Sequence, residues 1–222
     1  DVSELGAEYE KDCTIYPLTS EQLVELSNKT RGLVLRDDFC PVENLLAPVV
    51  LRSTAERAYE DWCHRGRKCL QQREFAEAAD CFRAAVEAYP SRRSVAALND
   101  LGRALTEQGR IREANETYLR AIQMDASFAL AHLNLAENLL SAGKRDEAVA
   151  SMLKGLAASS GSMGIVFTAA SLFQRAGELS RSAICYEEVV KLNPNNSDAR
   201  NNLATVLAAQ GKLAEAAEHL SR

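Results

Sequence analysis

Small residues recur at one fixed interval through most of this chain, and this repetition constrains the fold more than any other feature. The first series steps by 36 residues and then by 34 each time: Gly66, Gly102, Ala136, Ala170 and Ala204. A second series follows twelve residues behind: Ala78, Ala114, Ala148, Ser182 and Ala216. A third contains only glycine: Gly109, Gly143, Gly177 and Gly211. Three series with one spacing predict a repeated structural unit, because such a period is typical of repeat architectures.

Each series has a physical reason in a pair of helices. A small residue in the middle of each helix lets two helices approach closely, and glycine in the turn between them permits a positive φ. Large apolar residues are expected to fill the space opposite the small ones: Phe82, Tyr118, Met152, Tyr186 and Leu220. Aromatic residues make up only 6% of the sequence and alanine is abundant, which favours helix over strand. The sequence therefore predicts an all-α protein of helix-turn-helix repeats.

The predicted repeats occupy residues 59–222, in five successive units: 59–92, 95–128, 129–162, 163–196 and a truncated 197–222. In the fourth repeat Ser182 and Val189 replace the usual alanine, and we expect them to loosen its packing slightly. The last repeat stops at Arg222 before its second helix should end. This suggests that the chain is part of a longer protein.

The segment 1–58 lacks the period and is predicted to be a helical segment that caps the array. Thr19 and Gln22 form a capping-box pattern that predicts a helix to about Arg31. Pro41 and Pro48 are expected to break the following chain into short pieces, since proline interrupts a helix. A second capping box at Ser53 then predicts the start of the helix that contains Trp62.

These residues resemble the tetratricopeptide-repeat family, whose pattern W-x2-L-G-x2-Y is followed by A-x3-F, then A and P. The first repeat matches it with Trp62, Gly66, Ala78, Phe82 and Pro90. The resemblance covers about three-quarters of the chain. It implies a right-handed superhelix, or α-solenoid, in which the first helix of each repeat lines a concave groove.

The family's register implies which side chains face this groove. They form the predicted partner-binding site: Asn99, Asp100, Arg103, Asn134, Glu137, Thr168, Arg175, Asn201 and Asn202. The same register places His64, Arg67 and Glu107 on that face. The sixth position of each repeat is the most informative, because Asn134 and Asn202 can both donate and accept hydrogen bonds along a peptide backbone.

Two known groove chemistries can be compared with these positions. The asparagines are partly similar to the asparagine ladder in the repeat arm of O-GlcNAc transferases. The carboxylate clamp of cochaperones with these repeats needs a set of lysine, arginine and asparagine residues, and no frame of repeats supplies it. The first frame, for example, offers Cys63, Arg67, Asp100, Leu130 and Asn134.

The remaining composition points away from other classes of function. A formal charge of −5 argues against general binding of nucleic acids, which needs a basic surface. The three histidines lie at unrelated positions, and none of the six cysteines forms a CxxC pair, so we expect neither a metal site nor a cofactor. No apolar run reaches the length of a membrane span. We expect an intracellular protein whose segment here is not an enzyme.

The sequence thus predicts a scaffold or adaptor that binds a peptide or a partner helix in its groove. The alternative is a substrate-recruiting arm of a larger enzyme, such as a glycosyltransferase similar to O-GlcNAc transferase. Self-association through the ends of the array is a third possibility, since the ends of solenoids expose apolar surface.

Overall fold

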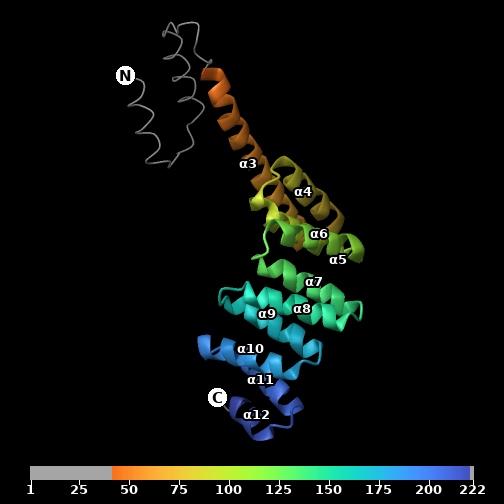
Figure 1. Cartoon of the computed structure of the whole chain (residues 1–222), viewed down its shortest axis with the longest axis vertical. Helices are drawn as coiled ribbons and strands as arrows, with labels where there is room; N and C mark the ends of the chain where they lie inside the picture. Colours follow the sequence, from red (N-terminus) through yellow and green to blue (C-terminus); the bar gives the residue numbers. More distant parts are fainter. Residues whose placement is uncertain (1–41, 221–222) are drawn as a thin grey trace, which may run out of the picture. The chain divides into compact units, whose positions relative to one another are not determined.

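The computed structural model describes the backbone of residues 42–220 and the side chains of residues 54–220. The chain divides into two compact units, Asp1–Val49 and Val50–Arg222. The described part is helical throughout and contains no strand. Its elements, shown in Figure 1, are α3 (Val42–Gln71), α4 (Phe75–Ala88), the 3-10 helix η1 (Arg92–Ser94), α5 (Val95–Glu107), α6 (Ile111–Met124), α7 (Ala129–Ser141), α8 (Arg145–Ala157), α9 (Met163–Arg175), α10 (Leu179–Leu192), α11 (Ser197–Ala209) and α12 (Leu213–Leu220).

The helices of the second unit stack in chain order. From α4 to α12, helices that follow each other in the chain pack together, while α5 also touches α7 and α7 also touches α9. Contacts therefore pass only between near neighbours along the chain, as in a solenoid of helix pairs. The predicted all-α solenoid is confirmed. We call the surface formed by α3, α5, α7, α9 and α11 the first-helix face.

The N-terminal predictions are only partly within the described residues. Helix α3 begins at Val42 and continues through Pro48 and Ser53, so the predicted break at Pro48 and helix start at Ser53 are wrong. A proline removes one backbone hydrogen bond but does not forbid a helix when the residues around it favour one. The predicted helix from Thr19 to Arg31 lies outside the described residues. The boundary at residue 58 and the capping role of 1–58 stay predictions.

The small-residue series marks the closest approach of paired helices, as predicted. A Cβ atom added to Gly102 would lie 2.4 Å from the Tyr118 ring, and one added to Gly66 would lie 2.8 Å from the Phe82 ring. Both rings are fully buried. The prediction for Leu220 is wrong, because this side chain is 64% exposed. In the other repeats the next helix along the chain helps to cover the equivalent side chain, such as Tyr186. Among the described residues no helix follows α12.

The fourth helix pair shows no loosened packing. Ser182 and Val189 are both fully buried. The Ser182 hydroxyl donates to the backbone oxygen of Ala170, 2.8 Å away in the partner helix α9. The expected looseness is therefore absent, because the serine replaces a close apolar contact with a satisfied hydrogen bond.

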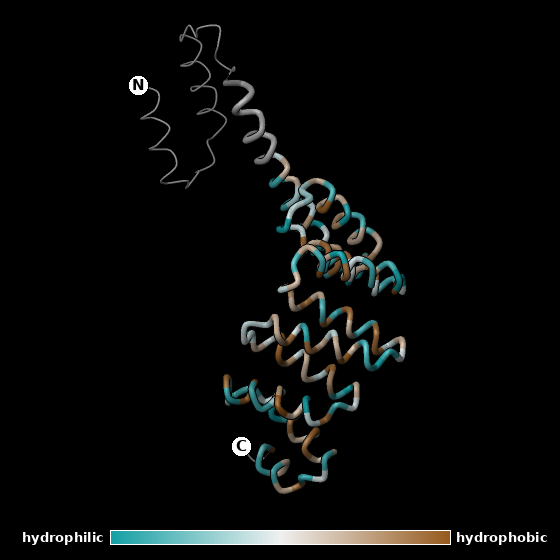
Figure 2. The backbone as a smooth tube through the Cα atoms, viewed as in Figure 1, coloured by the Kyte–Doolittle hydropathy of each residue, from teal (hydrophilic) through white to brown (hydrophobic). Residues whose placement is uncertain are grey.

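The core consists of two clusters of buried side chains that meet at α7. Leu135 belongs to the cluster shared with α3–α6, while Leu133 belongs to the cluster that continues to α12. Leu139 packs against both clusters. Figure 2 shows apolar and polar positions alternating along the helices, which is the pattern of helices that bury one stripe. Helix α7 therefore joins the two halves of the core.

Turns within the helix pairs require a left-handed residue, as the glycine series predicted. Gly109, Gly143, Gly177 and Gly211 have φ between 74° and 81°. The corresponding turn between α3 and α4 instead carries Arg73, with φ of 62°. A residue with a Cβ atom pays about 1–2 kcal/mol in this conformation. The first turn is thus the strained one of the series.

The variant Gly143→Ala is expected to lower the free energy of unfolding by about 1–2 kcal/mol. A Cβ atom at Gly143 would meet nothing within 4 Å, so the cost comes from its φ of 74° and not from a clash. Urea denaturation followed by circular dichroism measures the change. An unchanged unfolding midpoint would contradict the left-handed requirement at this turn.

Candidate partner-binding site

A cavity of about 350 Å³ opens on the first-helix face where three helix pairs meet. Its walls come from α3 and α4, from α5 and α6, and from α7. The lining residues are Leu70, Arg73, Phe75, Arg103, Thr106, Glu107, Tyr118, Asn134, Glu137 and Asn138. We call this cavity the α5–α7 pocket. It combines charged groups, amides and hydroxyls with an aromatic and aliphatic wall, which is the mixture expected of a binding pocket.

Asn134 is held in place by a side chain beneath it. Its amide nitrogen donates to the side-chain oxygen of Asn99, 2.8 Å away in α5. Asn99 is only 4% exposed and lies beside the Asp100 carboxylate. The side-chain oxygen and the second N–H of Asn134 remain available to a ligand. Asn99 was predicted to face the groove, but its burial makes it a support for Asn134.

A buried polar network forms the floor of the pocket. Asn138, 3% exposed, donates from its side-chain nitrogen to the Thr106 hydroxyl at 3.0 Å and to the Asn115 side-chain oxygen at 2.9 Å. Thr106 donates to the backbone oxygen of Gly102 at 3.0 Å, and its hydroxyl lies 3.4 Å from that of Tyr118. Burial raises the pKa of Tyr118 to about 12, so this phenol stays protonated. The network connects α5, α6 and α7 and keeps the floor rigid.

Ion pairs connect the pocket's charged residues to their neighbours. Glu137 accepts a hydrogen bond of 2.7 Å from Arg175 in α9. Arg103 faces Asp100 at the longer distance of 3.5 Å. Burial raises the pKa of Asp100, while the nearby cations Arg103 and Arg67 oppose that rise. Glu137 is therefore more fully neutralised by its partner than Arg103 is.

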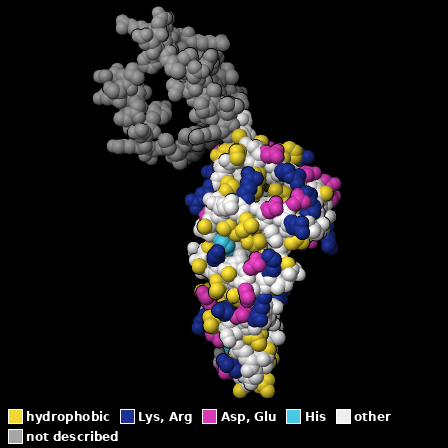
Figure 3. All heavy atoms as spheres, turned by 45° about the vertical axis from the view of Figure 1, so that its right-hand side comes forward, with side chains coloured by type: hydrophobic (Ala, Val, Ile, Leu, Met, Phe, Trp, Pro, Cys, Tyr) yellow, Lys and Arg dark blue, Asp and Glu magenta, His cyan; other side chains and the backbone are white. Residues whose placement is uncertain are grey.

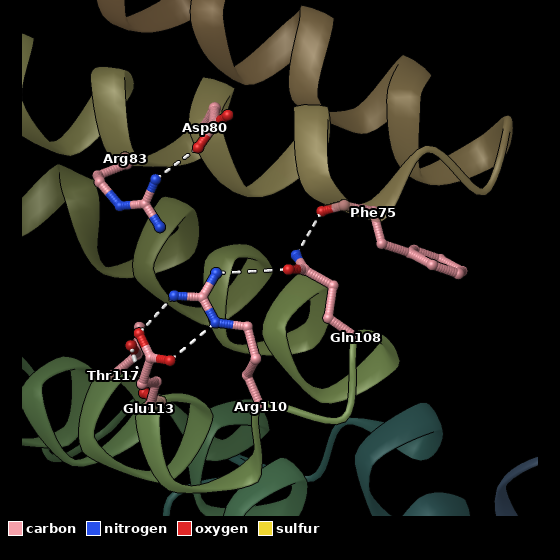
Figure 4. A network of polar contacts seen from close by, with 7 residues as sticks. All are labelled: Phe75, Asp80, Arg83, Gln108, Arg110, Glu113 and Thr117. Atoms are coloured by element: carbon pink, nitrogen blue, oxygen red, sulfur yellow. Dashed lines mark hydrogen bonds and ion pairs between the residues drawn. The ribbon is translucent and has the colours of Figure 1, made fainter.

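The wall formed by Phe75 is tied to the second helix pair. Gln108 donates from its side chain to the Phe75 backbone oxygen at 2.7 Å. Arg110 in turn contacts the Gln108 side-chain oxygen and makes a two-pronged pair with Glu113, at 2.7 and 2.6 Å (Figure 4). These contacts hold the start of α4 against the α5–α6 turn. The pocket wall is thus ordered before any ligand binds.

The structure brings together six of the nine predicted site residues. Arg103, Asn134 and Glu137 line the pocket, and Asn99, Asp100 and Arg175 contact these three. The other three lie outside the lining: Thr168, Asn201 and Asn202. Thr168 donates to the backbone oxygen of Gly164 in its own helix, and Asn202 lies near the Tyr186 hydroxyl, which donates to the Gln174 side-chain oxygen at 3.5 Å. No continuous ladder of amides follows the sixth positions in the described repeats.

Sequence reasoning missed three polar lining residues. Arg73 stands where the other turns carry glycine, and that exception was a signal that could have drawn attention to it. Asn138 occupies a position where the second, fourth and fifth repeats have Ala104, Leu172 and Val206 and the first has Lys68, so an amide at this mostly apolar position was a second signal. Thr106 gave no comparable signal, because its role depends on Asn138 in the next pair.

On the face drawn in Figure 3, basic and acidic side chains of the described residues are interspersed, with apolar ones between them. The described residues contain no group of three or more potential metal ligands, and their four cysteines are free thiols. Within the same part of the chain, no helix has both the length and the apolar character needed to cross a bilayer.

The fold and the pocket define a helical solenoid built from repeated helix pairs, with a polar cavity on the first-helix face. Family comparison agrees with this class. A family model described as "Tetratricopeptide repeat" matches residues 65–111 and 167–222, and one described as "TPR repeat" matches residues 102–143. Together they cover more than half of the chain. The chain belongs to the tetratricopeptide-repeat family, whose members are generally scaffolds for protein interaction.

Two curated relatives share part of the sequence. Peroxisomal targeting signal receptors of Kluyveromyces lactis and Candida albicans are 36% and 34% identical over 83 residues. These alignments cover 37% of this chain but only 14% of each receptor. The chain therefore spans a small share of the length of these relatives.

Solved structures of similar fold are more distant in sequence. The structure titled "Functional Characterization of Pseudomonas Aeruginosa pilF" has a TM-score of 0.63 at 19% identity and covers 75% of each chain. A MamA crystal structure has a TM-score of 0.58 at 17% identity, covering 75% of this chain and 90% of that one. MamA of Desulfovibrio magneticus RS-1 has a TM-score of 0.58 at 15% identity, with coverage of 74% and 92%. These likenesses concern the fold.

Proposed function

We propose that this chain is an interaction scaffold that binds an extended peptide segment of a partner protein on its first-helix face, with the α5–α7 pocket as the principal contact. The observation that carries the proposal is the orientation of Asn134 by the buried Asn99, at 2.8 Å. A fixed amide on the surface can hydrogen-bond a peptide backbone whatever its sequence. The relatives named as targeting signal receptors are consistent with recognition of a peptide.

The pocket suits a peptide better than a folded surface. Its volume of about 350 Å³ is near the lower end of the range for ligand pockets, which is roughly 300–1,000 Å³. Such a cavity holds one or two side chains. The ordered floor and wall lower the cost of binding, because few groups must be immobilised when the ligand arrives. The alternative of an arm that recruits substrates for a larger enzyme would use the same pocket.

The double variant Asn134→Ala with Asn202→Ala tests this function. Peptides selected from a random display library on the wild-type chain serve as ligands, and fluorescence anisotropy measures their affinity. We expect binding to weaken about thirtyfold, since the two lost hydrogen bonds cost about 1 kcal/mol each. The helical content should be retained.

Asn195→Ala is the matched control, because Asn195 is exposed in the turn between α10 and α11. Its affinity for the peptides should equal that of the wild type. Full affinity in the Asn134/Asn202 variant would refute the proposed contact. A failure of the library to yield any binding peptide would refute peptide binding itself.

A further inference from the structure

We propose that Arg73 and Arg103 form a subsite for a single carboxylate, so that the peptide bound in the α5–α7 pocket inserts an aspartate or glutamate side chain. The inference rests on the peptide-binding function proposed above and specifies the chemistry of one contact. Both arginines line the pocket, one from the turn after α3 and the other from α5.

The backbone at Arg73 supplies the first argument. Its φ of 62° is left-handed, and the four equivalent turns carry glycine. A side chain held in an unfavourable backbone conformation beside a pocket points to a role for that side chain in the pocket. Glycine would close the turn with less strain but would bring no charge.

The surroundings of Arg73 supply the second argument. Among the described residues it forms no ion pair, and its recorded contact is with the Phe75 ring, 5.9 Å from the guanidinium. That ring belongs to the wall held by Gln108. The guanidinium donors of Arg73 are thus free to meet an incoming anion, and carboxylates are the natural partners of such a planar fork.

Arg103 is the second cation of the subsite. Its pair with Asp100 is long, at 3.5 Å, and Asp100 also has the Asn99 side chain beside it. Arg103 is 56% exposed and can therefore reorient toward a ligand. A carboxylate between Arg73 and Arg103 would gain two charge-assisted contacts, which are stronger than neutral hydrogen bonds.

The carboxylates that line the pocket favour a monoanion over a dianion. Glu137 is paired with Arg175, whereas Glu107 makes no ion pair among the described residues. A carboxylate carries one negative charge, whereas a phosphate carries about −1.5 to −2 and would be repelled more strongly by Glu107.

Peptides selected from a random display library on the wild-type chain provide the probes. Each is synthesised with its acidic residue retained, changed to glutamine, or changed to phosphoserine, and affinities are measured by fluorescence anisotropy. We expect an enriched aspartate or glutamate in the selected sequences. The glutamine peptide should bind about tenfold more weakly, as expected for the loss of a charge-assisted pair.

The variant Arg73→Gly carries the decisive comparison. It places in this turn the residue of the other four turns, so the fold should be retained. We expect it to bind the acidic peptide about tenfold more weakly and to bind the acidic and glutamine peptides nearly alike. Arg112→Gln, which removes an exposed arginine from α6, is the matched control and should keep the wild-type preference.

The outcomes separate the two proposals. Peptides that bind without an acidic residue, or an Arg73→Gly variant that keeps the full preference for one, would overturn the carboxylate subsite and leave peptide binding intact. Tighter binding of the phosphoserine peptide would also overturn it, since the subsite would then accept a dianion. If no peptide is selected at all, the proposed function fails and the subsite fails with it.

Discussion

The variant Gly102→Leu is expected to lower the free energy of unfolding by about 3 kcal/mol, near the upper end of the usual cost of overpacking. A Cβ atom alone would lie 2.4 Å from the Tyr118 ring, which is far inside van der Waals contact. The ring cannot move away freely, because it is 1% exposed and its hydroxyl lies 3.4 Å from that of Thr106. Urea denaturation followed by circular dichroism measures the loss.

Gly164→Ala is the control for this variant. Gly164 also lies within a first helix, α9, but a Cβ atom there meets nothing within 4 Å. Alanine should therefore leave the stability unchanged or raise it by less than the roughly 0.5–1 kcal/mol of a helix interior, since Gly164 is the second residue of α9. If the Gly102→Leu protein were as stable as the wild type, α5 and α6 could move apart at no cost. That result would contradict close packing between these two helices.

A second variant tests whether contact with the Tyr118 ring causes this loss of stability. In the third pair, Ala136 and Met152 occupy the places of Gly102 and Tyr118, and both are fully buried. The double variant Gly102→Ala with Tyr118→Met should therefore be more stable than the sum of the two single changes predicts. Simple additivity would mean that the two side chains do not interact.

The variant Asn138→Ala is expected to lower the free energy of unfolding by about 2–3 kcal/mol. It removes hydrogen bonds of 3.0 Å to Thr106 and 2.9 Å to Asn115, and the Asn115 oxygen loses a donor in a half-buried place. Loss of one partner in a buried network costs more than the net value of a hydrogen bond, because the remaining group is left unsatisfied. Denaturation of the purified variant measures the change.

The damage from Asn138→Ala should be local. Hydrogen exchange is expected to accelerate in α5, α6 and α7 and to change little in α11 and α12, because each helix pair contacts only its neighbours. Asn195→Ala, at an exposed turn, should leave both stability and exchange unchanged. A uniform increase in exchange along the chain would contradict a network confined to one junction.

These variants bear on function as well as stability. Tyr118, Thr106 and Asn138 form the floor of the α5–α7 pocket, and Arg103 and Asn134 stand above it on α5 and α7. A variant that loosens the floor should therefore weaken peptide binding through lost order, even where no contact to the ligand is removed. The Asn134 and Arg73 variants, in contrast, should weaken binding with little change in helical content.

The fold could be predicted because its determinants are local and repeated. A glycine at a turn indicates a left-handed backbone, and Gly143 has the expected positive φ. A small residue opposite a large one indicates two helices in close contact, and Gly102 lies against the Tyr118 ring as expected. The errors lie where a repeat has no neighbour to compare with. Pro48 precedes the periodic region, and Leu220 lies at the end of the last described helix.

The candidate site was predictable only in part. The family's register placed Arg103, Asn134 and Glu137 on the first-helix face, and all three line the pocket. It also placed Asn99 there, although the neighbouring helix buries this side chain to 4% exposure. The family's register tells in which direction a side chain leaves its own helix. Whether that side chain is exposed depends on how closely the neighbouring helix packs against it.

The sequence alone determined that this chain forms stacked helix pairs with tight, glycine-closed turns, since spacing, residue size and backbone freedom are properties of the chain itself. Only the tertiary structure decided that Arg73, Thr106 and Asn138 share one cavity with Asn134. These residues come from a turn and two separate helices. Their proximity arises from the packing of three successive pairs, which no pattern within a single repeat records.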